Sequence, residues 1–140
     1  MKKITFRKSG SDINSNVFME IEKLIGVVIP EAMKELFESA NGGVPDECYF
    51  YASEDPEPLW IKLFLSFETP HIEGRNILDT YQYLHQKGFF QEPCIPFAID
   101  HGGNFFVVNM SGGIDFIACD MSSREVSKSF EAFIDNLFDE

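Results

Sequence analysis

The sequence has few basic residues and no long apolar run, and each shortage argues against a class of partner. Eleven Lys and Arg stand against 23 Asp and Glu, so the formal net charge is −12 at pH 7. Such a charge repels the phosphates of nucleic acids and anionic membrane surfaces. No uncharged apolar run approaches the roughly 18 residues that a membrane-spanning helix needs, and the opening MKKITFRKSG lacks the apolar core of a secretory signal. We therefore expect a cytoplasmic protein with no nucleic-acid partner and no membrane partner.

Metal-binding and disulfide motifs are also missing. The three cysteines are far apart without CxxC spacing, and the three histidines have no partner at i+4. These residues are Cys48, Cys94, Cys119, His71, His85 and His101. We expect reduced thiols, no metal and no cofactor. Cys119 lies in an apolar run and is expected to be a small core residue.

The signatures of phosphate binding and serine hydrolysis are absent too. The chain contains neither GxxxxGK[ST] nor GxSxG, although His101-Gly102-Gly103 resembles an esterase oxyanion loop. We interpret the glycine pairs at 102–103 and 112–113 as hairpin turns, and Gly42-Gly43 as the end of a helix. A Cys–His or Asp–His pair that forms only on folding stays open as a hydrolase site. Nothing in the sequence argues for one.

Apolar residues at helical spacing predict four helices in a chain of 140 residues, of which 44% are hydrophobic and fifteen are Phe. The expected helices cover 16–26, 30–40, 76–87 and a stretch that begins at Ser129. The inner face of the first is expected to carry Val17, Ile21, Leu24 and Ile25, and the last is expected to be capped by the Ser129 hydroxyl.

Runs of aromatic and β-branched residues predict the strands. They cover 48–52 and 59–67, then 95–100, 105–110 and 114–120, with 4–6 as a short first strand or an arm. The last three runs are separated by short Gly-rich connections, which is typical of an antiparallel meander. The expected class is α+β: one domain over residues 1–140, with a central, mainly antiparallel sheet, about four packed helices, and a C-terminal meander followed by a final helix.

Acidic residues gather in two places. Five lie in two loops close in sequence, and three fall at i, i+4 and i+8 on the solvent side of the expected last helix: Asp46, Glu47, Glu54, Asp55, Glu57, Glu131, Asp135 and Asp139. Like charges at helical spacing are unfavourable by about 0.2–0.5 kcal/mol per pair. A solvated surface and a docking face for a cationic protein both explain these clusters.

Three ordered blocks lie within residues 17–45, 95–119 and 127–138: IEKLIGVVIPEAMKELFESANGGVP, IPFAIDHGGNFFVVNM and SKSFEAFIDNLF. Together they resemble the SUKH superfamily. The positions that match the family pattern are Pro30, Asn41, Gly42, Gly43, Pro96, Asp100, Gly103 and Asn104. Ala32-Met33 departs from it, because the pattern more often has a polar–aromatic pair there. We expect Asp100 to close its turn by accepting backbone N–H groups.

The resemblance implies a non-enzymatic protein. Many bacterial members resemble immunity proteins that neutralise toxin domains from contact-dependent or secreted systems, and these toxins are often nucleases or other nucleic-acid-modifying enzymes. The partner would then be a cognate protein toxin domain, met by the acidic residues above, with this chain as a monomer or weak homodimer. The alternatives are a regulatory or scaffolding domain with endogenous partners, as in a eukaryotic branch, and a hydrolase.

Overall fold

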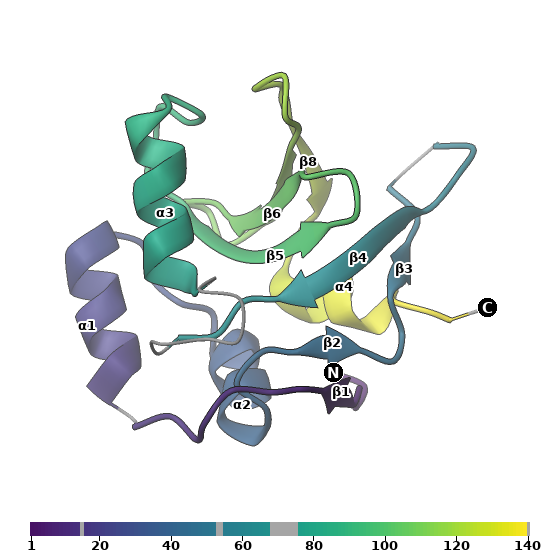
Figure 1. Cartoon of the computed structure of the whole chain (residues 1–140), viewed down its shortest axis with the longest axis horizontal. Helices are drawn as coiled ribbons and strands as arrows, with labels where there is room; N and C mark the ends of the chain where they lie inside the picture. The colour runs from purple at the N-terminus through teal and green to yellow at the C-terminus, as the bar shows by residue number, and fades with distance from the viewer. Residues whose placement is uncertain (15, 53–54, 68–75, 140) are drawn as a thin grey trace.

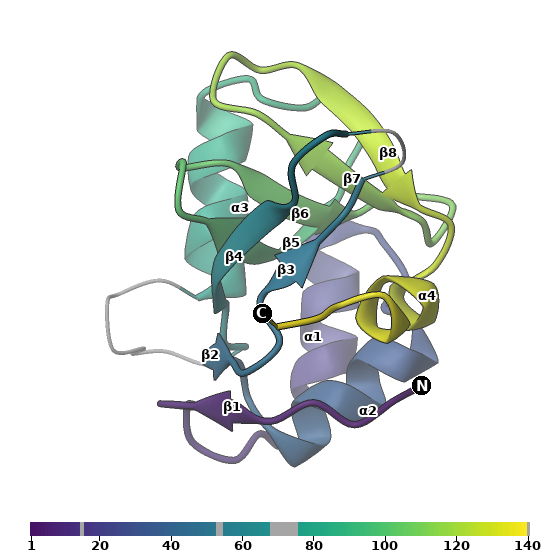
Figure 2. The ribbon, with the colours of Figure 1, turned by 90° about the vertical axis from the view of Figure 1, so that its right-hand side faces the viewer.

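A curled, six-stranded antiparallel sheet forms the centre of the computed structural model, which describes residues 1–14, 16–52, 55–67 and 76–139 (Figure 1). Its strands, in spatial order, are β3 (Tyr49–Phe50), β4 (Leu59–Phe64), β5 (Ile95–Asp100), β6 (Phe105–Val108), β7 (Ile114–Ile117) and β8 (Ser123–Ser127). A two-stranded sheet of β1 (Phe6–Arg7) and β2 (Val44–Pro45) lies beside β4 (Figure 2).

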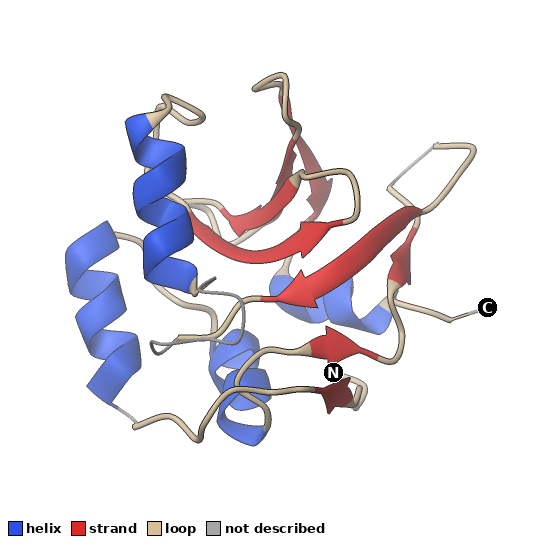
Figure 3. Cartoon of the chain, viewed as in Figure 1, coloured by secondary structure: helices blue, strands red, loops and turns tan. Residues whose placement is uncertain are grey.

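The described helices are α1 (Asn16–Ile25), α2 (Glu31–Ser39), α3 (Ile77–Gln86) and α4 (Phe130–Asp135). Figure 3 shows α3 and α4 on opposite sides of the sheet. This arrangement explains why all six residues of β5 are buried. The α+β class, the antiparallel sheet and the meander before the last helix are confirmed. None of the helices in the described ranges is long and apolar enough to cross a membrane.

Phenylalanine rings build the core between the sheet and α4. The Phe97 ring contacts the rings of Phe64, Phe106, Phe130 and Phe133, with centroids 5.2–6.5 Å apart. Burial of each such ring is worth roughly 1.5–3 kcal/mol. The segment after α3 closes the other face of the sheet with a smaller apolar cluster around Cys94.

The inner face of α1 differs from the prediction at two positions, Phe18 and Leu24. Phe18, Ile21 and Ile25 are buried, whereas Leu24 is 65% exposed. The Phe18 ring packs edge-on against Phe67, with ring centroids 5.0 Å apart. The predicted N-cap of α4 is confirmed, since Ser129 Oγ accepts the Ala132 N–H at 3.0 Å.

The meander has a fourth strand that the sequence does not reveal. β8 pairs with β7 and is mostly exposed, so its sequence SREVS lacks the apolar alternation of a half-buried strand. β7 ends at Ile117, and Cys119 follows in an exposed turn, so the prediction of a core cysteine is wrong. The hairpin turns themselves are confirmed, with positive φ of 81° at Gly103 and 87° at Gly112.

Gly42 and Gly43 have a different role from the one predicted. α2 ends at Ser39, and Ala40 is already extended, so neither glycine closes the helix. Both have positive φ, of 75° and 116°. A Cβ on Gly42 would lie 2.7 Å from the carbonyl oxygens of Phe64 and Leu65, so the glycines let this segment lie directly against β4.

Candidate functional site

Two of the predicted contact acids hold the N-terminal segment to the body of the protein. The Asp46 carboxylate accepts the Thr5 N–H at 3.0 Å and the Thr5 hydroxyl at 2.8 Å. Burial opposes ionisation of Asp46, but these bonds and the Glu47 N–H outweigh it and lower its pKa. Glu47 pairs with Lys2 Nζ at 2.7 Å, and Lys2 Nζ also donates to the Leu137 carbonyl.

The acids near the C-terminus hold the same segment. Asp135 accepts the Lys2 N–H at 2.7 Å, and Glu131 lies 3.6 Å from the amino group of Met1. The expected i, i+4, i+8 row does not form, because α4 ends at Asp135 and Asp139 lies beyond it. Glu131 and Asp135 therefore stabilise the N-terminal segment, and Asp139 is separate from them.

The acids of the 51–58 loop divide between structure and surface. Asp55 makes a two-fold contact with Arg124 of β8, at 3.1 and 2.6 Å, and this hydrogen bonding lowers the pKa of Asp55. Glu57 is exposed and makes no ion pair with the described residues, and the same holds for Asp139. Glu54 and His71 lie outside the described residues.

A row of aromatic side chains crosses the outer side of β3 and β4. Neighbouring ring centroids are 3.9–5.9 Å apart along the series His101, Trp60, Tyr49, Phe138 and Tyr51, which we call the aromatic strip. Trp60 is 49% exposed and Tyr51 50% exposed. Phe138 reaches the strip because the C-terminal segment pairs with β3 through two hydrogen bonds with Tyr49, of 2.9 and 3.0 Å.

The sequence contained a signal for part of this strip. In a strand, alternate side chains face opposite sides, and Trp60 alternates with the buried Ile61 while Tyr49 and Tyr51 flank the buried Phe50. The outward position of three large aromatic residues could be read from that alternation. The contributions of Phe138 and His101 depend on tertiary contacts.

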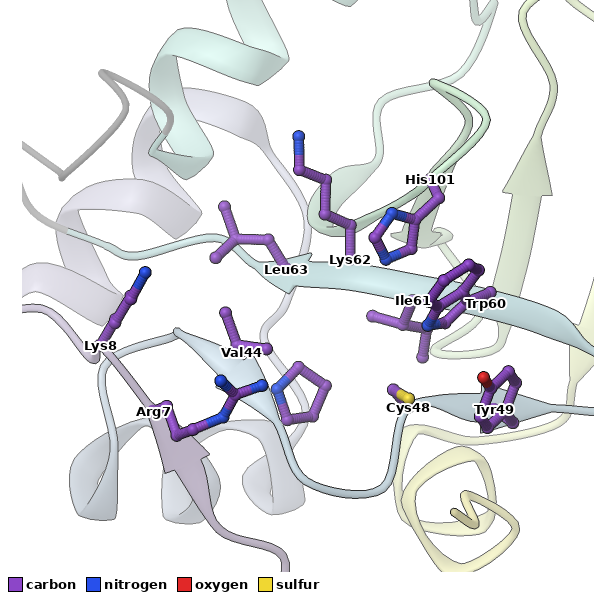
Figure 4. A pocket seen from close by; sticks show the side chains of 11 residues that line it. Arg7, Lys8, Val44, Cys48, Tyr49, Trp60, Ile61, Lys62, Leu63 and His101 are labelled. Carbon is purple, nitrogen blue, oxygen red and sulfur yellow. The ribbon is translucent and has the colours of Figure 1, made fainter. Parts of the chain in front are cut away.

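A groove of about 480 Å³ opens beside the strip, between β2 and β4 (Figure 4). Backbone hydrogen bonds at its two ends define the groove. Gly43 and Phe64 exchange hydrogen bonds of 2.9 and 2.8 Å, and the Ile61 N–H donates to the Cys48 carbonyl at 2.7 Å. Between these two contacts, residues 44–47 face only residues 62–63, so the longer segment bows away from β4.

The groove is basic, although the protein is strongly acidic. Arg7, Lys8 and Lys62 line it from β1, the residue after β1, and β4, and none of them makes an ion pair with the described residues. Lys8 has a positive φ of 57°, an unfavourable conformation for a bulky residue. His101 and Trp60 close one end, with ring centroids 3.9 Å apart.

The groove also bears on the possibility of a Cys–His catalytic pair. Cys48 and His101 both line it, but no hydrogen bond joins them in the described part of the chain (Figure 4). Among the described residues, no three His, Cys, Asp or Glu side chains are grouped so as to hold a metal ion.

The family comparison agrees with this architecture. A family model described as SMI1 / KNR4 family (SUKH-1) matches residues 13–136. The chain belongs to the SMI1 / KNR4 (SUKH-1) family. This membership indicates an immunity or regulatory domain that acts by protein–protein interaction. Comparisons with curated proteins and with solved structures find no significant match.

The SUKH-1 motif positions lie at turns and in the core. Asn41 is buried; its side chain donates to the Ser11 carbonyl at 2.8 Å and accepts the Phe67 N–H at 2.9 Å. Pro30 directly precedes α2 rather than occupying its first turn, and Pro96 lies within β5. None of these three residues belongs to the aromatic strip or lines the basic groove.

Proposed function

We propose that this SUKH-1 protein is an immunity protein that binds a cognate bacterial toxin domain and neutralises it through protein–protein contact. The observation that carries the proposal is the aromatic strip, with Trp60 and Tyr51 each about half exposed. Trp and Tyr are the side chains most often responsible for the affinity of protein interfaces. A partner that covers the strip would bury large apolar rings. The side chains of the strip would lose little conformational entropy, because aromatic side chains have few rotatable bonds.

Charge supports a basic toxin. The net charge of −12 draws a cationic partner, and Glu57 and Asp139 are exposed acids on the two segments that carry Tyr51 and Phe138. A nuclease or other nucleic-acid-modifying toxin presents Lys and Arg to phosphates. The positive potential of these residues would also attract an acidic inhibitor. We place the encounter in the cytoplasm, where such a toxin would act. The paired acids, such as Asp46 and Asp135, contribute to the field rather than to direct contacts.

The test is growth rescue in a naive host. The C-terminal domain encoded by the neighbouring large open reading frame is induced with and without this protein, and rescue is expected from the wild type. Trp60→Ala and Tyr51→Ala should weaken rescue. Tyr83→Ala is the matched control, because Tyr83 is 50% exposed on α3, outside the strip.

Two results would count against the proposal. Toxicity that the wild-type protein does not relieve would remove that toxin as the partner and favour a regulatory domain with endogenous partners. Equal loss of rescue in Tyr83→Ala and the strip variants would show that the strip is not the binding surface. Circular dichroism of each variant separates lost binding from lost folding.

A further inference from the structure

We propose that the groove between β2 and β4 binds an acidic, extended segment of the partner protein. This inference rests on the proposed function, since the groove and the aromatic strip share Tyr49, Trp60 and His101. The groove would therefore be part of the same interface. It would determine the orientation in which the partner docks.

The first argument is charge. Arg7, Lys8 and Lys62 are brought to one groove from two sheets, and none is neutralised by the described acids. Among the other described cations, Lys2, Lys34, Arg124 and Lys128 pair with carboxylates of this chain. Lys3, Lys23 and Lys87 also make no ion pair with the described residues, but none of them lines the groove. A concave basic site on an acidic surface attracts a local negative charge that the rest of the molecule repels. The complementary occupant carries carboxylates.

The second argument is shape. Figure 4 shows the head groups of Arg7, Lys8 and Lys62 at separate points, with the side chains of Val44 and Leu63 between them. A phosphate group needs donors that converge on one point. An extended peptide instead rises about 3.3 Å per residue, so its charged side chains are spread along its length. The spread of the cations therefore favours several carboxylates along an extended peptide.

The third argument is the apolar end of the groove. Trp60 stacks on Tyr49, with ring centroids 5.9 Å apart, and makes a tilted contact with His101 at 3.9 Å. The exposed part of these rings can contact an apolar or aromatic side chain at the end of the acidic segment. A long nucleic acid could also stack a base on these rings, but the net charge of −12 opposes its approach outside the groove.

Specificity is the physical consequence. A uniformly acidic surface would bind a basic partner in many orientations, because unlike charges at long range do not fix a register. One basic groove inside that surface penalises every orientation that places a basic patch against it. The acidic segment of the partner then has a single favourable position.

Trp60 provides the measurement, because it is the single Trp of the chain and lines the groove. The probe is the synthetic peptide acetyl-(Glu-Thr)₄-amide, titrated at low salt while Trp60 fluorescence is recorded. We expect a saturable change that weakens as salt rises toward 0.15 M, where the Debye length falls to about 8 Å. Arg7→Glu and Lys62→Glu, on different elements, should each weaken binding at least about threefold, as removal and reversal of an exposed ion pair predicts.

The matched control is Lys87→Glu, which makes the same charge change at an exposed residue after α3. It should leave the affinity within about 1.5-fold, since screened surface charges at a distance contribute little. The peptide acetyl-(Lys-Thr)₄-amide, which the acidic surface attracts elsewhere, should not produce this saturable change in Trp60 fluorescence. Equal effects of Lys87→Glu and the groove variants, equal binding of the basic peptide, or no fluorescence change would overturn the proposal. Tighter binding of ATP than of the acidic peptide would assign the groove to a nucleotide instead.

Growth rescue separates this inference from the proposed function. If the wild type fails to rescue but the acidic peptide still binds the groove, the immunity proposal fails and the groove assignment stands. If the wild type rescues but the peptide does not bind, only the groove assignment fails.

Discussion

The side chains of Asp100 and Asn104 close the hairpin turn between β5 and β6. The Asp100 carboxylate accepts the Asn104 N–H at 2.8 Å, the Asn104 side-chain amide at 2.9 Å and the Gly102 N–H at 2.9 Å. Asn104 Oδ1 in turn accepts the Cys119 N–H at 2.8 Å. The prediction that Asp100 accepts backbone N–H groups is confirmed. Through Asn104, Asp100 also connects two neighbouring hairpin turns of the sheet.

Replacement of Asp100 is expected to destabilise the fold. Asp100 is only 7% exposed, so Asp100→Ala leaves three donors without their charged acceptor. We expect the free energy of unfolding in urea to fall by about 2–3 kcal/mol. Asp120→Ala removes a comparable turn acceptor, for Ser122, at an exposed position and should have a smaller effect. Equal losses of unfolding free energy in the two variants would contradict the prediction that burial makes the Asp100 hydrogen bonds more stabilising.

Features with local causes could be predicted from the sequence. The turn at Gly103, the cap at Ser129 and the helix that ends before Gly88 depend on residues within a few positions of one another. β8 could not be predicted from the sequence, because an exposed strand has no apolar alternation. The groove could not be predicted, because the residues that form it come from separate parts of the chain that meet only in the folded protein, among them Arg7, Cys48, Lys62 and His101.

The charge clusters show the same limit. The sequence shows that Asp46, Glu47 and Asp135 are acidic and near other acids, but their partners Thr5 and Lys2 lie more than 40 positions away. The sequence therefore could not show which of these acids have partners within the chain. In the structure, four of the eight predicted contact acids, Asp46, Glu47, Glu131 and Asp135, hold the N-terminal segment.

Gly42 and Gly26 allow crowding to be separated from backbone strain. Their φ values are similar, 75° and 86°, but a Cβ at Gly26 meets nothing within 4 Å, while one at Gly42 meets the carbonyls of Phe64 and Leu65. Gly26→Ala should cost about 1–2 kcal/mol, from the left-handed conformation alone. Gly42→Ala should cost a further 1–3 kcal/mol, roughly, because β4 must move. Urea unfolding measures both, and equal costs would show that the segment at Gly42 relaxes freely.

The contact between Asp46 and Thr5 is expected to break in acid. Desolvation opposes ionisation of the exposed Asp46, but hydrogen bonds to its carboxylate outweigh this effect and lower its pKa, so the ionised form favours the folded state. Its contribution is fully present above the ordinary carboxyl value of 3.8 and is lost as pH falls through the lower folded pKa. The Thr5 amide resonance should titrate with a midpoint below 3.8. Asp46→Asn should abolish that titration and cost about 0.5–1 kcal/mol, whereas Asp12→Asn should leave it intact.

The three thiols are expected to react in an order set by burial. Burial raises the pKa of Cys94 to about 12, with a smaller contribution from Asp115, so this thiol is neutral and shielded at pH 8. Cys119 is exposed and Cys48 is half-buried in the groove. With a chromogenic disulfide reagent, Cys119 should react first, Cys48 more slowly, and Cys94 only on unfolding, since the thiolate is the nucleophile. Variants that each retain one cysteine identify the phases.

Because the folded pKa of Cys94 is raised, its neutral form favours the native state below pH 9, and this contribution should be lost as pH rises toward 12. Rapid labelling of Cys94 in the native protein at pH 8 would mean that the cluster beneath the segment after α3 opens readily.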